Sequence, residues 1–170
     1  MKIMKRTAYS LGTLAALTAA TLALPRHVSV ERSSLIDASP SEILALAASN
    51  AGYQRFNPYQ TIDPDLEVAF FGPASGVGSG FHFDSRDGTG SQIVAEVTQT
   101  EVFYVIDLGR MGQPTQSIAA VATEAGTEVT WRMQSDMRMN PVFRVFGLFM
   151  DGMMGPTFEL GLENLAEAAA

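Results

Sequence analysis

NPVFRVFGLFMDGMMGPTFELGLENLAEAAA, residues 140–170, is the stretch that decides the fold. Apolar side chains recur in it at intervals of three or four residues, which places them on one face of an α-helix. These are Phe143, Phe146, Met150, Met154, Phe158, Leu162 and Leu165. Asn140 followed by Pro141 is typical of a helix start, because asparagine caps the first turn and proline is tolerated at the first helical position. The pattern predicts one long amphipathic helix over 140–165.

A second apolar stripe lies beside the first in the N-terminal half of this predicted helix. It consists of Val142, Val145, Phe149 and Met153. Because this half is apolar around most of its circumference, we expect it to be buried on more than one side. Pro156 lacks the N–H that would bond back to Gly152, so the pattern also predicts a bend there.

Upstream of this helix, the apolar period changes from helical spacing to alternation. Residues 28–36 form a predicted first strand, and Ser39, Pro40 and Glu42 are typical of a capped helix start. A second short helix and an aromatic loop are expected within 50–64. Alternating runs separated by turn residues then predict an antiparallel meander whose concave apolar face only the final helix can cover. The predicted strands are 66–71, 78–84, 91–97, 102–108, 115–123 and 127–134.

Length and composition bound the classes of function. The 170 residues suit one domain, and the absence of cysteine excludes disulfides, cysteine-ligated zinc and thiolate nucleophiles. The net charge is −7, and no lysine follows Lys5. Such a surface repels phosphate backbones, so nucleic acid is not an expected partner. No cofactor or metal is expected, because carboxylates such as Asp63, Asp65 and Glu67 are equally explained by a polar loop.

The N-terminal segment, residues 1–25, is predicted to be a membrane anchor or a signal segment. Lys2, Lys5 and Arg6 precede an uncharged run over 7–24, which is close to the minimum length for a transmembrane helix. Cations ahead of the run indicate a cytoplasmic N-terminus, which places the following domain on the extracytoplasmic (periplasmic) side. Thr18-Ala19-Ala20 keeps open the alternative of signal cleavage and secretion.

The sequence contains no recognisable catalytic constellation. His82 and Asp84 alternate with Phe81 and Phe83, so the polar pair is expected to face solvent if the phenylalanines face inward. The glycine-rich run 72–80 is followed by neither a helix nor a lysine, and it is interpreted as a hairpin turn rather than a phosphate-binding loop. Arg132 is out of phase with the apolar side chains of its strand and is expected outside.

Several short segments, in this order and spacing, resemble the START-like (SRPBCC) superfamily, in particular its polyketide cyclase/dehydrase-like members. They are Val28–Ser33, Asp37–Glu42, Gly72–Gly78, Gly126–Trp131, Phe146–Asp151 and Gly155–Glu159. The resemblance implies that 26–170 form an α+β helix-grip domain, in which a bent antiparallel sheet of about seven strands wraps a long C-terminal helix around an elongated apolar cavity. It implies a fold and not an activity. Members often carry tryptophans after the second helix, where this chain has Tyr53, Phe56 and Tyr59.

Methionines and aromatic residues suggest what such a cavity would hold, since flexible thioethers beside rings adapt to irregular apolar ligands. The predicted lining residues are Tyr53, Phe56, Phe81, Phe83, Tyr104, Trp131, Met133, Phe143, Phe146, Met150, Met154 and Phe158. A filled core made of the same residues is the alternative. The first hypothesis is therefore a membrane-anchored domain that binds a hydrophobic small molecule or lipid.

Two other hypotheses stay open. A cyclase/dehydrase-like enzyme would need convergent polar groups inside the cavity, such as Tyr104 with Asp107 or with His82 turned inward. A ligand-free protein-interaction module would show a filled cavity and an exposed second stripe on the C-terminal helix.

Overall fold

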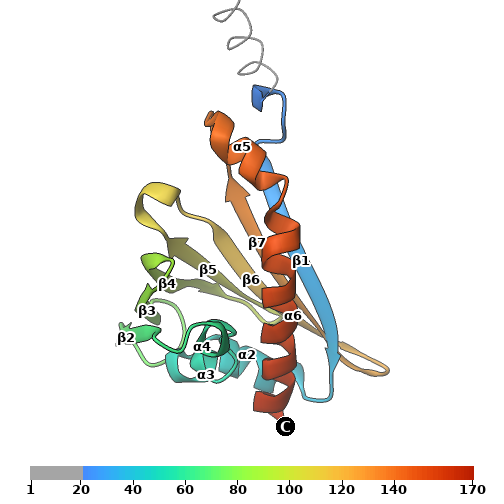
Figure 1. Ribbon diagram of the computed structural model, residues 1–170. Coiled ribbons are helices and arrows are strands. Elements are labelled where there is room, and N and C mark those ends of the chain that lie inside the picture. The colour runs from blue at the N-terminus through green and yellow to red at the C-terminus, as the bar shows by residue number, and fades with distance from the viewer. Residues whose placement is uncertain (1–20) are drawn as a thin grey trace, which may run out of the picture.

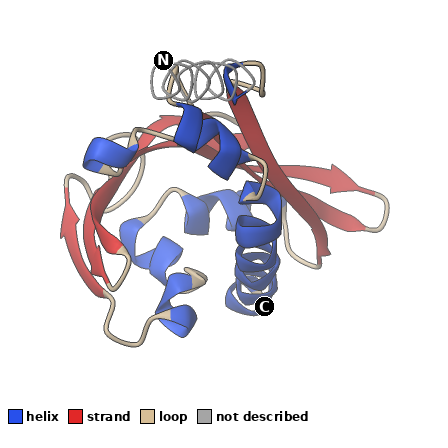
Figure 2. Ribbon diagram, turned by 45° about the horizontal axis from the view of Figure 1, so that its top comes forward, coloured by secondary structure: helices blue, strands red, loops and turns tan. Residues whose placement is uncertain are grey.

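A computed structural model describes residues 21–170 and shows one curved antiparallel sheet that encloses helices on its concave side (Figures 1 and 2). The seven strands are β1 (His27–Ile36), β2 (Glu67–Phe71), β3 (Gly80–Ser85), β4 (Gly88–Val97), β5 (Glu101–Asp107), β6 (Thr115–Thr123) and β7 (Gly126–Asp136). Their order is β1-β7-β6-β5-β4-β3-β2, so β2 to β7 form the predicted meander and β1 pairs with its last strand. A bulge between Val94 and Glu96 adds to the bend of the sheet.

Three short helices connect β1 to β2: α2 (Pro40–Ala47), α3 (Asn50–Gln54) and α4 (Tyr59–Ile62). The predicted start of α2 is confirmed, because Ser39 and Glu42 form a reciprocal capping box. A single 3₁₀ turn (Gly109–Met111) follows β5. The chain ends in α5 (Pro141–Gly147) and α6 (Met150–Ala169).

The prediction of one helix over 140–165 is wrong, although its start at Asn140 is confirmed by the bonds that the asparagine side chain accepts from Val142 and Phe143. The helix is interrupted between α5 and α6, just after Gly147. A β-carbon on Gly147 would lie 2.8 Å from Val28 Cγ2, so this glycine allows α5 to contact β1 closely. Proline does not cause the interruption, since α6 runs through Pro156.

The concave face of the sheet is covered by two groups of helices rather than by the final helix alone. α6 lies along β1 at one side of the sheet, and α2 packs against β5 and β6 (Figure 1). The core between them contains fully buried Trp131, Tyr104, Phe56, Phe158 and Leu165. The final helix was expected to cover the whole concave face. It covers the side near β1, and α2 covers the side near β5 and β6.

Arg32 holds α6 on β1 through a contact that sequence patterns do not predict. Its guanidinium lies over Gly155 and binds Asp151 at 2.9 Å and Glu159 at 2.8 Å. These three α6 residues are four apart and share one helix face. The Arg32 hydrogen bond lowers the pKa of the Asp151 carboxyl below its ordinary value, against a smaller opposing effect of desolvation.

The second apolar stripe is exposed, which contradicts the expectation that the N-terminal half would be buried on more than one side. Val142 is 72% exposed and Phe149 is 62% exposed, and Phe146 of the first stripe is also exposed. After β7 the chain turns through Arg138, whose φ is 51°, and α5 lies beyond the ends of the strands (Figure 1). Nothing within residues 21–170 covers its outer side.

The segment predicted to be an anchor, residues 1–25, lies almost entirely outside the described residues. Among residues 21–170, no helix combines the length and apolar character needed to cross a membrane.

Candidate functional site

The candidate site is a cluster of buried polar side chains in the hollow of the sheet. Tyr53 comes from α3, Gln92 from β4 and Gln116 from β6, and all three are buried. Gln116 Nε2 donates a hydrogen bond of 3.0 Å to the Tyr53 hydroxyl. Burial raises the pKa of Tyr53 well above its ordinary value, although interactions with Gln116 and Gln92 partly oppose the rise. The phenol is therefore neutral at physiological pH and keeps its proton for donation.

Tyr104 and the end of α2 form the neighbouring wall. The Tyr104 hydroxyl donates a buried hydrogen bond of 2.8 Å to the Ala47 carbonyl, which joins β5 to the C-terminal end of α2. Burial raises the pKa of Tyr104 as well, so it is a second neutral phenol. Its bond satisfies one of the carbonyls that a helix end leaves unpaired.

Asn50 joins α3 to the glycine-rich turn before β3. Its side-chain amide donates to the carbonyls of Phe71 and Pro73 at 3.3 Å each, and its oxygen accepts 2.8 Å from the buried Ser79 hydroxyl. Gly72 has a φ of 72°, and a β-carbon there would collide with the Gly78 carbonyl. The prediction of a tight turn is confirmed, and this turn closes one side of the hollow.

The space left between these groups is small. A cavity of about 10 Å³ lies between α2, α3 and strands β3 to β5. It is lined by Ala47, Ser49, Asn50, Tyr53, Ser79, Gly80, Phe81, Gln92, Val94 and Tyr104. About 10–15 Å³ is the minimum that holds one water molecule. In this conformation the candidate site has no room for a drug-sized ligand, so side chains fill the hollow.

Aromatic rings supply most of that filling. The Tyr53 ring lies 4.8 Å from Phe56 and 5.5 Å from Phe81 between centroids. Trp131 stacks on Phe158 of α6 at 5.3 Å with an interplanar angle of 10°. The Trp131 indole N–H is buried and finds no acceptor among the described residues. Buried donors without a partner are rare in folded proteins, so this one is a place where a ligand acceptor or a water molecule would stabilise the structure.

The predicted lining residues fall into several groups. Tyr53, Phe81 and Tyr104 border the small cavity. The buried core contains Phe56, Trp131, Met133, Met150 and Phe158. Partly buried positions against that core hold Phe83, Phe143 and Met154. Phe146 is 46% exposed and lies on α5, outside the hollow. Their role as ligand contacts stays a prediction. Gln92 and Gln116 were missed, although each occupies an inward position in the alternation of its strand.

A second, open depression of about 580 Å³ crosses β2 to β5 near the edge of the sheet. His82, Asp84 and Glu67 contribute to its lining and are exposed. The expected outward direction of His82 is confirmed. Its ring lies 4.7 Å from that of Phe71. Among residues 21–170, no three or more His, Asp or Glu side chains are grouped so that they would hold a metal ion.

The polar set proposed for an enzyme does not converge in this structure. Tyr104 points into the core, whereas His82 and Asp107 are exposed. Asp107 instead accepts a bond of 2.8 Å from the Gly109 backbone. Arg132, expected outside, pairs there with Glu31 at 2.5 Å. The pairings of Tyr104 with Asp107 or His82, given as examples of what an enzyme would need, are therefore not formed in the hollow.

The strand order, the curved sheet and the C-terminal helix on its concave side define an α+β protein of the helix-grip class. The chain belongs to the family described as polyketide cyclase / dehydrase and lipid transport, whose family model matches residues 27–170. The START-like (SRPBCC) assignment made from the sequence is thereby confirmed. No curated protein matches the sequence.

Solved structures with the same fold are distant in sequence. SA2116 of Staphylococcus aureus, a protein of unknown function, is 15% identical with a TM-score of 0.62, over 84% of this chain and 93% of that one. The di-domain aromatase/cyclase StfQ from the steffimycin biosynthetic pathway is 10% identical with a TM-score of 0.61, over 84% of this chain. This chain spans half of StfQ. Aha1 of Colwellia psychrerythraea, solved as a dimer, is 18% identical with a TM-score of 0.56, over 84% of this chain and 96% of that one. At these identities the likeness shows the fold alone.

Proposed function

We propose that this chain binds an apolar small molecule or a lipid in the hollow between the sheet and α6, with the ligand's polar group held by Tyr53, Gln92 and Gln116. The observation that carries the proposal is the burial of these polar side chains among aromatic rings. Buried polar groups cost stability unless hydrogen bonds such as that between Gln116 and Tyr53 compensate, whereas a core that served packing alone could use apolar side chains there. The family description, which includes lipid transport, supports the same class of ligand.

Ligand entry requires the hollow to widen. The cavity holds about 10 Å³, whereas small-molecule sites typically span roughly 300–1,000 Å³. The segments that close it are α3 and the turn before β3, and Asn50 joins them through the hydrogen bonds of its side chain. We expect α3 and this turn to move together as the hollow widens, because the Asn50 hydrogen bonds connect them to each other. In the widened hollow, the Trp131 N–H could donate a hydrogen bond to an acceptor atom of the ligand.

Trp131 provides the test, because it is the only tryptophan of the chain and lies in the core beside the proposed site. The full chain in detergent micelles would be titrated with 9,10-dibromostearic acid and, separately, with stearic acid. Bromine quenches indole fluorescence on contact, so the brominated acid should quench Trp131 saturably and stearic acid should compete with it.

A matched pair of variants controls for indirect effects. Gln116→Leu removes the buried amide and should weaken the quenching at least several-fold. Gln134→Leu makes the same change at an exposed position on the opposite face of the sheet and should leave it unchanged. The proposal would be overturned if quenching in the wild-type chain rose linearly with the brominated acid and stearic acid did not reduce it.

The same proposal places the domain at a membrane, tethered by the uncharged run over 7–24, on the extracytoplasmic side. Since the chain has no cysteine, a single Glu124→Cys in the turn between β6 and β7 would report its side of the membrane. Labelling of intact cells by an impermeant maleimide is expected. Labelling only after lysis would place the domain in the cytoplasm and refute this part.

A second candidate function is a ligand-free interaction module. The filled hollow and the exposed stripe that includes Val142 and Phe149 favour it. It predicts that the brominated acid never quenches Trp131 saturably, whereas the first candidate requires that it does.

A further inference from the structure

Helix α5 buries its arginine and exposes most of its apolar side chains, which is the reverse of what a helix in water usually does. Its buried residues are Arg144 and Gly147, and Phe143 is partly buried against the core. Its exposed side carries Val142, Val145 and Phe146, continued one turn later by Phe149; these four side chains are called the α5 face. A surface helix of a globular protein normally buries such an apolar face and exposes its arginine. The reversal indicates that the α5 face meets an apolar medium.

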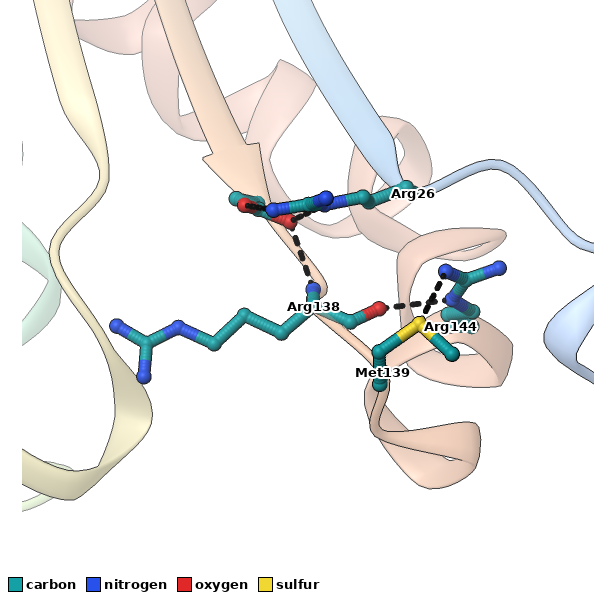
Figure 3. A network of polar contacts seen from close by, with 5 residues as sticks. Arg26, Arg138, Met139 and Arg144 are labelled. Atoms are coloured by element: carbon teal, nitrogen blue, oxygen red, sulfur yellow. Dashed lines mark hydrogen bonds and ion pairs between the residues drawn. The ribbon is translucent and has the colours of Figure 1, made fainter.

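Arg144 is buried because it binds the end of the N-terminal segment. Its guanidinium donates to the carbonyl oxygens of Leu22 and Leu24, the latter at 2.9 Å. It also donates 2.9 Å to the Arg138 carbonyl and contacts the Met139 sulfur at 3.6 Å (Figure 3). The last residues of the uncharged run, Leu22 and Leu24, therefore lie directly against the buried side of α5, with the α5 face turned outward.

A second set of contacts fixes this junction. Arg26 and Asp136 form a two-point ion pair at 2.7 and 2.8 Å, and the Met137 N–H donates 2.8 Å to the Arg26 carbonyl. The Asp136 carboxylate also accepts the Arg138 N–H at 2.7 Å (Figure 3). The side chain of Arg138 extends away from this network. The end of the apolar run and the α5 face are thus held together by the folded domain.

We infer that the α5 face docks into the interfacial layer of the lipid bilayer that the run 7–24 enters. This inference rests on the membrane tether of the proposed function. Apolar side chains next to a membrane-inserted segment gain free energy by leaving water for the boundary of the acyl chains. Arg26 and Arg138 lie at the same junction, where guanidinium groups would meet lipid phosphates. Tether and α5 face together would orient the domain on the membrane surface, which a single tether does not do.

The test uses a matched pair of valines in the cysteine-free chain. Val142→Cys lies on the α5 face, and Val121→Cys is an exposed apolar position on β6, in the hairpin with β7. Each full-length variant would be labelled with an NBD fluorophore and reconstituted into vesicles of phosphatidylcholine and phosphatidylglycerol in equal parts. We expect the label at position 142 to shift its emission to the blue and to be quenched by spin-labelled phosphatidylcholine. The label at position 121 should do neither.

The outcomes separate the docking from the tether. A chain that floats with vesicles while the two labels behave alike would overturn the docking and leave the tether intact. A blue shift at position 142 without quenching by the spin-labelled lipid would mean that protein, a second copy or another part of the chain, covers the α5 face, and would also overturn the docking. A chain that does not float with vesicles would refute the tether and, with it, this inference.

Discussion

Adding one methyl group to Gly161 tests whether the α6 helix grips the sheet as tightly as the core indicates. A β-carbon at this position would overlap the Trp131 ring, with Cη2 at 3.0 Å and Cε3 at 3.2 Å and Cζ3 closer still. The ring is 1% exposed, stacked on Phe158 and in edge contact with Phe56 at 5.7 Å. It therefore has no free space in which to retreat.

The magnitude follows from two opposing effects. Overpacking a filled core typically costs about 1–3 kcal/mol. Replacing glycine by alanine within a helix interior gains about 1 kcal/mol. Gly161→Ala should therefore lower the free energy of unfolding by up to about 2 kcal/mol. Gly152→Ala is the matched control, because apart from its chain neighbours and the backbone of its own helix no described atom lies within 4 Å of its added β-carbon. This control should keep or raise stability.

Urea unfolding of both variants, followed by Trp131 fluorescence and far-UV circular dichroism, measures the difference. The helix-propensity gain is similar in the two variants, so the gap between them should approach the overpacking cost of about 1–3 kcal/mol. If Gly161→Ala were as stable as Gly152→Ala, the tight contact between α6 and Trp131 would be refuted. In that case the hollow would be looser than its geometry indicates.

Three further predictions concern the hydrogen bonds and ion pairs around the hollow. Tyr104→Phe leaves the buried Ala47 carbonyl without its partner and should cost about 1–3 kcal/mol in urea unfolding, whereas Tyr59→Phe, at a residue 40% exposed, should cost far less. Arg32→Met should speed amide hydrogen exchange in the first turns of α6, since it removes the pairs to Asp151 and Glu159; exchange at the wild-type rate would exclude the clamp. Because Arg32 lowers the Asp151 pKa, the charged carboxylate stabilises the fold above the ordinary pKa of 3.8, and this contribution is lost as pH falls below it. The melting temperature should accordingly fall less between pH 5 and pH 3, about one unit either side of that pKa, in Asp151→Asn than in wild type. Equal falls in the two proteins would count against a stabilising ion pair between Arg32 and Asp151.

Most of the fold was predictable because its signals are local. The capping box of Ser39 and Glu42 is a contact between neighbours in sequence, and the N-cap of Asn140 is another. The alternation in β3 and β7 correctly placed His82 and Arg132 outside. Such signals depend on hydrogen bonds and side-chain directions within a few residues, so they do not require knowledge of tertiary contacts.

The candidate site was only partly predictable. Aromatic residues such as Tyr53 and Tyr104 were expected in the hollow and lie there. The polar partners Gln92 and Gln116 were missed, because alternation shows which face of a strand a glutamine occupies and not whether helices cover that part of the face. The volume of the cavity could not be predicted from the sequence either, because it depends on how aromatic rings from α3, β7 and α6 pack against one another.

The sequence by itself determined the succession of strands and helices, the antiparallel meander and the family, because periodicity and short motifs carry that information along the chain. Only the tertiary structure decided that the C-terminal helix breaks after Gly147, that Arg32 lies over Gly155, and that the α5 face stays exposed. The physical reason is that each of these depends on which residues, distant in sequence, lie within a few ångströms of one another. An apolar stripe predicts that something must cover it, and only the packed molecule shows whether its own chain does so.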